Sequence, residues 1–180
     1  MKKILILLVV LLLAAAGAFA QATDAHTVTI TVAALGVIGL NSTADIPFTT
    51  TAPALPGNPP GPVVGAEAQD NTKSLFYTTA NRVGKTRHIT VGTDVNPPAG
   101  TSLSVLATVA GGAGTGAGTV SVTTASVDLV TAIGSVATGR AAGNGSSLLY
   151  KFWVSNPALL VVGASPTVVT VTYTMTADTF

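Results

Sequence analysis

The chain has 180 residues, of which 48% are hydrophobic and 8% are charged, and its formal net charge is +1. It contains no cysteine, which excludes disulfides and thiolate metal sites, and so small a charge argues against binding to nucleic acid or to an acidic membrane surface. Low charge with abundant Thr, Val, Ala and Gly favours a β-sheet domain.

Residues 1–20, MKKILILLVVLLLAAAGAFA, have the pattern of a secretory signal peptide. Lys2 and Lys3 precede an apolar run that ends on the small-residue triplet AFA, which predicts cleavage before Gln21. The alternative is a retained membrane anchor, but the run is short for a span. Cleavage would leave six basic and seven acidic side chains. We expect one domain over 21–180 that is secreted to the periplasm, the cell surface or the medium and is not integral to a membrane.

Strict alternation follows soon after the predicted cleavage point. HTVTITV places Val28, Ile30 and Val32 on one face and threonines on the other, the pattern of a half-buried strand. Residues 47–62, PFTTTAPALPGNPPGP, then hold six of the ten prolines. Proline cannot supply central-strand donors, so this stretch predicts a long surface connection, which we interpret as a crossover between two sheets.

The rest of the chain reads as short strands separated by Gly, Pro and Asn. We predict strands at 74–79, 87–93, 102–109, 119–124 and 148–155. Segment 126–134, SVDLVTAIG, fits one helical turn or a strand equally well. Near the C-terminus, VVTVTYTM alternates Val169, Val171 and Tyr173 with threonine. Together these patterns predict an all-β, antiparallel, immunoglobulin-like β-sandwich of about seven to nine strands.

No motif in the sequence carries catalytic or metal chemistry. GAGTGAG is followed by a Thr- and Val-rich strand rather than a helix, so it predicts a hairpin loop and not a phosphate site. His26 and His88 do not form a pair at metal-ligand spacing, and no serine stands in a G-x-S-x-G elbow. Glu67 and Asp70 are the only carboxylates close in sequence. We predict no enzyme, no catalytic residue, no cofactor and no metal.

Two local features allow a binding role and a structural one. Lys85, Arg87 and His88 belong to a basic stretch on a predicted hairpin, SLFYTTANRVGKTRHITV. They could contact an acidic glycan or a carboxylate of a neighbouring subunit, or they could protect an exposed edge from wrong pairing. Trp153 in LLYKFWVS could face outward as a sugar-stacking platform or pack on the sheet.

The two ends of the predicted domain resemble assembly segments of known proteins. TVVTVTYTM resembles the closing strand of secreted bacterial fimbrial subunits and of spore-coat-protein-U-type domains, and AHTVTITVAALGVIGL resembles the segment that such subunits lend to a neighbour. The resemblance implies an incomplete sandwich that is completed by a strand from another copy or another surface subunit. Many such subunits carry a Cys pair that this chain lacks. The expected assembly strands contain Val28, Ile30, Val32, Val169, Val171 and Tyr173.

The expected function is therefore a secreted structural or adhesion-type subunit. A carbohydrate-binding module with Trp153 exposed is the first alternative, with a glycan as partner. An ice-binding surface is the second, because Thr-x-Thr rows at 27–31 and 170–174 could form a hydroxyl array if the two strands were adjacent.

Overall fold

The chain forms two compact units, Met1–Val32 and Ala33–Phe180. The computed structural model describes residues 27, 29, 35–48, 67–141, 144–160 and 167–177. In the first unit these are Thr27 and Thr29, both exposed. The predicted signal peptide, residues Val28, Ile30 and Val32, and most of the proline-rich connection lie outside the described residues. The strands on either side of that connection, at 35–40 and 68–80, are antiparallel neighbours in one sheet, so the interpretation of 47–62 as a crossover between two sheets is wrong. Within the described part of the chain, no helix is long and apolar enough to cross a membrane.

The second unit is all-β, as the sequence predicts. Its elements are β1 (Leu35–Leu40), β2 (Ala68–Ala80), β3 (Arg87–Thr93), β4 (Thr101–Thr108), β5 (Thr115–Gly116), β6 (Thr119–Ser121), β7 (Val127–Ile133), β8 (Val136–Ala137), β9 (Ser146–Val154), the 3-10 turn η1 (Pro157–Leu159) and β10 (Val171–Ala177). The described residues contain ten strands, more than the expected seven to nine. Two of them, β5 and β8, have two residues each, too few for a period of two to be visible.

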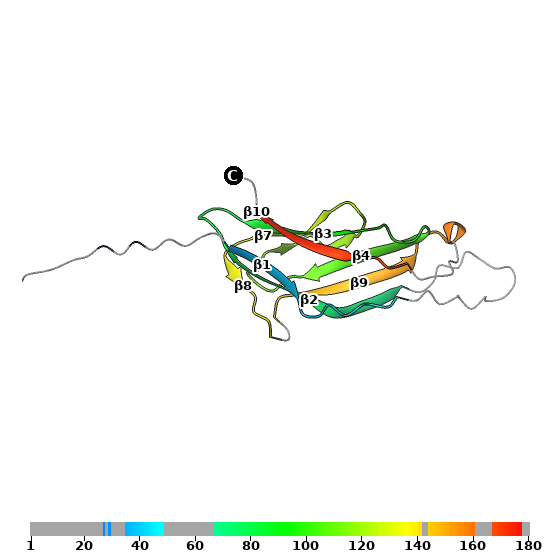
Figure 1. Cartoon of the computed structure of the whole chain (residues 1–180), viewed down its shortest axis with the longest axis horizontal. Coiled ribbons are helices and arrows are strands. Elements are labelled where there is room, and N and C mark those ends of the chain that lie inside the picture. The colour runs from blue at the N-terminus through cyan, green and yellow to red at the C-terminus, as the bar shows by residue number, and fades with distance from the viewer. Residues whose placement is uncertain are drawn as a thin grey trace, which may run out of the picture. The chain divides into compact units, whose positions relative to one another are not determined.

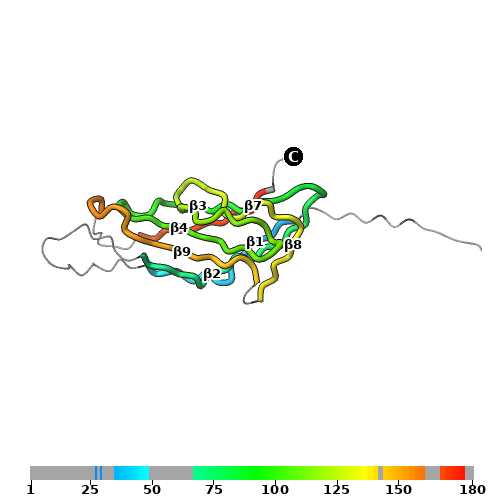
Figure 2. Tube along the Cα trace, turned by 180° about the vertical axis from the view of Figure 1, so that it is seen from behind, coloured from blue at the N-terminus to red at the C-terminus, as the bar shows by residue number. Residues whose placement is uncertain are grey.

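The strands form two antiparallel sheets. Sheet A has the order β1-β2-β9-β4-β6, with β8 also paired to β2, and sheet B has the order β10-β3-β7-β5. Figure 1 shows β10 beside β3, and Figure 2, seen from behind, shows β9 between β2 and β4. One hydrophobic core joins side chains of both sheets, including Leu75 and Leu148 from sheet A and Ile89 and Leu129 from sheet B, none of which is exposed.

Alternation explains the best-predicted strands. In β9, Leu148, Tyr150 and Val154 are buried, whereas Ser147 is exposed on the other face. β3 has the predicted bounds, and β9 differs from its prediction by one or two residues at each end. Segment 126–134, for which helix and strand were equally supported, contains the strand β7. Leu129 and Val130 are both fully buried there, so the strand departs from strict alternation, and its register with β3 is shifted.

The predicted hairpin of β2 and β3 is wrong, because β2 belongs to sheet A and β3 to sheet B. Their link, 81–86, has six residues, which can cross the roughly 10 Å between packed sheets, whereas the tightest hairpins use two-residue turns. Asn81 secures the crossing: its Nδ2 donates to the carbonyl of Ile133 in β7 at 2.8 Å.

GAGTGAG connects paired strands, as predicted. β4 and β6 are antiparallel neighbours, and the loop between them contains β5, which pairs with β7 of sheet B. The loop therefore ties the two sheets together, and a strand follows it rather than the helix that a phosphate site needs.

Candidate functional site

An incompletely buried apolar region lies where β1 of sheet A meets β10 of sheet B. β1 and β10 contact each other, and among the described strands each pairs on one side only, β1 with β2 and β10 with β3. Half-buried apolar side chains pack against the core from β1, β10 and the segments next to them: Ile38, Leu40, Ile46, Phe48, Val169, Val171, Tyr173 and Met175. We call this set the seam. Three of the predicted assembly residues, Val169, Val171 and Tyr173, belong to it.

Among the described residues, the backbone of β10 has no strand partner on its outer side. The amide of Asp94 donates to the carbonyl of Thr170 at 3.2 Å, so Thr170 and Asp94 form a hydrogen-bonded pair. Such pairs alternate along an antiparallel ladder, which places the Thr172–Gly92 pair in the same class. The N–H and C=O groups of Val171 and Tyr173 therefore point away from β3. β10 can accept another strand there.

A tyrosine pair joins the two sheets beside the seam. The hydroxyls of Tyr150 in β9 and Tyr173 in β10 are hydrogen bonded to each other. Tyr77, the third tyrosine, donates to the carbonyl of Ala113 at 2.7 Å and lies 3.1 Å from Ser146 Oγ. Burial raises the pKa of all three hydroxyls, and in Tyr173 the neighbouring Tyr150 raises the pKa further.

The raised tyrosine pKa values predict loss of stability in alkali. Below pH 10, the ordinary tyrosine pKa, all three hydroxyls are neutral in both states, and their full contribution is present. Above it the unfolded chain ionises first, so the free energy of unfolding falls by about 1.4 kcal/mol per pH unit for each tyrosine. Absorbance at 295 nm should stay flat beyond pH 10 until the protein unfolds, whereas the chain in guanidinium should titrate near pH 10. Normal titration of the folded protein would contradict this prediction.

The structure does not gather Lys85, Arg87 and His88 on one face. Lys85 lies in the link between β2 and β3, and the next two begin β3, where successive side chains point to opposite faces. Arg87 Nε donates to Asn81 Oδ1 at 2.9 Å, and His88 Nε2 lies 4.0 Å from Asp128 Oδ1 on the paired strand β7. Arg87 and His88 thus contact side chains of the same unit, and a joint acidic-ligand contact remains a prediction.

Lys73, which directly precedes that basic stretch in the sequence, has a structural position. Its side chain is only 6% exposed, and its amine donates to the carbonyl of Ala44. This bond holds the segment after β1 against β2. No sequence pattern distinguishes this lysine from its exposed neighbours.

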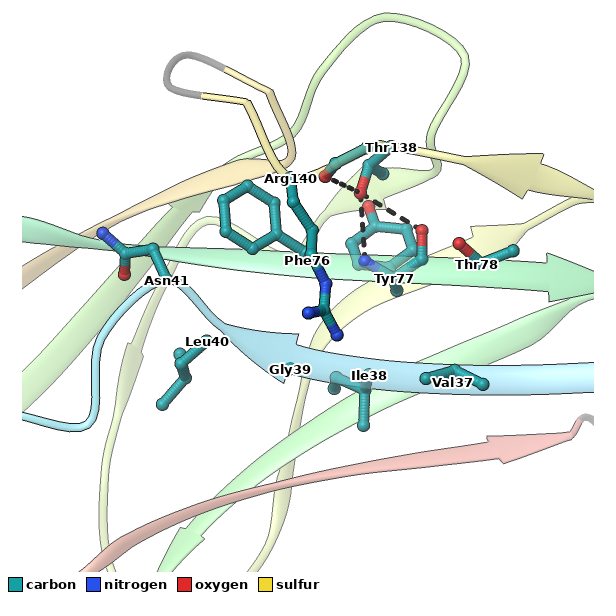
Figure 3. Close-up of a pocket in the computed structure, with 11 residues that line it drawn as sticks. Val37, Ile38, Gly39, Leu40, Asn41, Phe76, Tyr77, Thr78, Thr138 and Arg140 are labelled. Atoms are coloured by element: carbon teal, nitrogen blue, oxygen red, sulfur yellow. Dashed lines mark hydrogen bonds between the residues drawn. The ribbon is translucent and has the colours of Figure 1, made fainter.

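A pocket of about 320 Å³ opens between β1, β2 and the residues after β8. Its lining residues are Val37, Ile38, Gly39, Leu40, Asn41, Phe76, Tyr77, Thr78, Thr138, Gly139 and Arg140. Figure 3 shows Thr138 hydrogen bonded to the backbone of Tyr77 and the Arg140 side chain pointing toward β1. Thr138 Oγ1 accepts from Tyr77 N at 3.0 Å and donates to Tyr77 O at 3.1 Å, which fixes one wall of the pocket. The sequence contains no motif that identifies it.

Trp153 lies on the outer face of sheet A. Tyr150 and Val154 are buried, so alternation turns Lys151 and Trp153 the other way, and Trp153 is partly exposed. Lys151 Nζ pairs with Glu67 Oε1 at 2.9 Å, which links β9 to the residue directly before β2, 84 positions away in the sequence. Of the two predicted positions for Trp153, the structure shows the outward one, on the face opposite Tyr150.

The structure describes in full only one of the two threonine rows on which the ice-binding alternative depends. Thr172 and Thr174 are exposed on β10, but the residues opposite them on β3 are Gly92 and Thr90. The row at 27–31 belongs to the other compact unit. Adjacency of the two rows, on which that alternative depends, stays a prediction.

Within the described ranges, no group of three or more His, Cys, Asp or Glu side chains could hold a metal ion. No protein-family model matches the chain, and no curated protein or solved structure matches it either. Function must therefore be inferred from the seam, the pocket and the outer face of sheet A.

Proposed function

We propose that this chain is a secreted, non-catalytic structural subunit whose copies join by β-strand addition along β10. In this proposal residues 1–20 are a cleaved signal peptide, and 21–180 form an immunoglobulin-like sandwich that is incomplete at the seam. The segment HTVTITV of one copy adds to β10 of another. The observation that carries the proposal is the combination, in β10, of free outward backbone groups with half-buried apolar side chains.

The donor and acceptor sequences match in length and pattern. HTVTITV and β10 both have seven residues and alternate apolar side chains with threonine. In the joined state Val28, Ile30 and Val32 would extend the inner row that contains Val171 and Tyr173, and so bury the seam. The threonines of the donor would pair with those of β10 on the outer face, a favourable cross-strand arrangement.

The short connection between HTVTITV and β1 favours addition of HTVTITV to β10 of another copy rather than to β10 of the same copy. Leu35 pairs with Ala80 at one end of β2, and Ala177 pairs with Arg87, where the chain has just crossed from β2. To reach β10 of its own copy, the segment would have to reverse direction in the two residues Ala33 and Ala34. Two-residue reversals use residues with positive φ, such as Gly or Asn, and alanine disfavours that conformation.

Truncation tests the proposal directly. We expect the chain from Gln21 to form concentration-dependent oligomers or filaments in light scattering and electron microscopy, and the chain lacking 21–32 to stay monomeric and folded. A synthetic HTVTITV peptide should bind the truncated chain, because β10 and the seam are then free. A monomeric chain from Gln21, or a truncated chain that unfolds, would contradict exchange between copies.

A pair of triple substitutions controls for simple loss of chain length. Changing Val28, Ile30 and Val32 to threonine keeps strand propensity but removes the apolar row, so assembly should be lost. Changing the three threonines at 27, 29 and 31 to serine leaves the apolar row intact, so assembly should persist. Equal effects of the two triple variants would argue against an inward-facing donor row.

A further inference from the structure

The partly exposed Trp153 is surrounded by hydrogen-bonding side chains from three strands. Ser102 of β4 is its register partner, and Ser104 is the partner of Lys151. On the other side, β2 places Gln69 opposite Lys151, and Glu67 directly precedes β2. Lys151 and Trp153 alternate with the buried Tyr150 and Val154, so their register partners share the outer face of sheet A with them.

The charges of this face cancel within a hydrogen-bonded array. Glu67 Oε1 accepts from Lys151 Nζ at 2.9 Å and from Gln69 Nε2 at 2.6 Å. These two contacts lower the pKa of Glu67, so its carboxylate stays ionised at neutral pH. The array offers a carboxylate, an ammonium and an amide beside an indole ring with no net charge.

One hydroxyl of the face has hydrogen-bonding capacity left over. Ser104 Oγ is buried, and within the described residues it makes no hydrogen bond. Because this oxygen has almost no accessible surface, a ligand on the outer face cannot reach it, and it is not part of the platform. Its strand neighbour Ser102 lies opposite Trp153.

We infer that Trp153, Lys151, Glu67, Gln69 and Ser102 form a binding platform for a neutral glycan built of β-linked glucopyranose-type rings. The ring hydrogens of such a sugar present an apolar face that stacks on indole, and its equatorial hydroxyls project sideways toward donors and acceptors. Strands about 4.8 Å apart place those groups on both sides of Trp153. An acidic glycan is disfavoured because Lys151 is already neutralised by Glu67.

This inference is independent of the assembly proposal. The seam lies at β1 and β10, whereas the platform lies on β2, β9 and β4, the inner strands of sheet A. Loss of assembly would leave the platform intact, and loss of glycan binding would leave the seam intact. The two proposals can therefore fail separately.

The experiment uses the single tryptophan of the chain as its own reporter. Cellohexaose and chitohexaose are titrated at millimolar concentrations into the chain from Gln21, with a hexamer of galacturonic acid as the charged control. We expect one of the neutral glycans to change Trp153 emission saturably, with an affinity that is nearly independent of salt, and the charged control to have no effect. No emission change with either neutral glycan would overturn the inference.

Variants locate the binding within the platform. By calorimetry, Trp153→Ala should weaken binding at least about tenfold, the loss of about 1.4 kcal/mol expected for one aromatic contact. Glu67→Gln retains the reporter and should weaken binding with little effect on folding, because the carboxylate is at the surface. Leu149→Ala, on the same strand and face, is the control that should bind normally. Binding unchanged in both Trp153→Ala and Glu67→Gln would overturn the assignment.

Discussion

Val171→Pro is expected to abolish assembly while the domain remains folded. The amide of Val171 points away from β3, so proline at this position removes no hydrogen bond of the sheet. Proline is tolerated on edge strands where the N–H faces outward and at the first residue of a strand, and Val171 begins β10. The added strand would lose a donor and meet the proline ring at the edge.

Thr172→Pro is the matched control one residue away. Its amide faces β3, and its register partner Gly92 is buried, so proline there leaves a carbonyl of β3 without its donor. An unpaired buried group costs about 1–3 kcal/mol, and the ring adds strain. We expect a lower free energy of unfolding for Thr172→Pro in urea denaturation.

Light scattering and urea denaturation together decide the outcome. The expected result is a stable monomer for Val171→Pro and a destabilised domain for Thr172→Pro. If Val171→Pro assembles like the parent chain, β10 is not the acceptor, and the free side of β1 is the next edge to test. If it unfolds the domain, the deduced direction of its amide is wrong.

Gly145→Ala is expected to lower the free energy of unfolding by about 2–5 kcal/mol. Gly145 has φ +80°, and a Cβ there would lie 2.5 Å from the carbonyl oxygen of Leu75, a backbone atom that cannot yield. A left-handed conformation costs a residue with a Cβ about 1–2 kcal/mol, and overpacking adds about 1–3 kcal/mol. The substitution would push β9 from β2 where Ser146 pairs with Leu75.

Gly118→Ala separates the two causes. Gly118 has φ +85°, but a Cβ there meets nothing within 4 Å. In this variant the free energy of unfolding should therefore fall only by the cost of the left-handed conformation, about 1–2 kcal/mol. Thermal or urea denaturation of both variants provides the comparison. Equal losses would show that the contact with Leu75 relaxes.

The three regions have different relations to the fold. The seam exists because β1 and β10 are edge strands, each paired with only one of the described strands. It therefore results from the strand order of the two sheets. The platform exists because the inner strands of sheet A keep polar and aromatic residues on their outer face. The pocket depends on the residues after β8, where Thr138 ties the chain to Tyr77.

The assembly residues illustrate the limit of a local pattern. Alternation placed Val169, Val171 and Tyr173 on one face, and the structure confirms that all three are half-buried against the core. AHTVTITVAALGVIGL was expected as one segment to be lent to a neighbour. Its second half, LGVIGL, is β1 and pairs with β2 of the same chain. The role of the first half remains a prediction.

The sequence by itself determined the all-β class and the positions of β3, β9 and β10, because alternation is a relation between residues two apart. Only the tertiary structure decided that β2 and β3 lie in different sheets, that 126–134 contains a strand, and that Lys73 is buried. It also brought together Tyr150 with Tyr173 and Glu67 with Lys151. Such pairs form only between strands that become neighbours in the fold. Strands become neighbours when distant segments bury their apolar side chains in one core, and a local period of two does not predict which segments will do so.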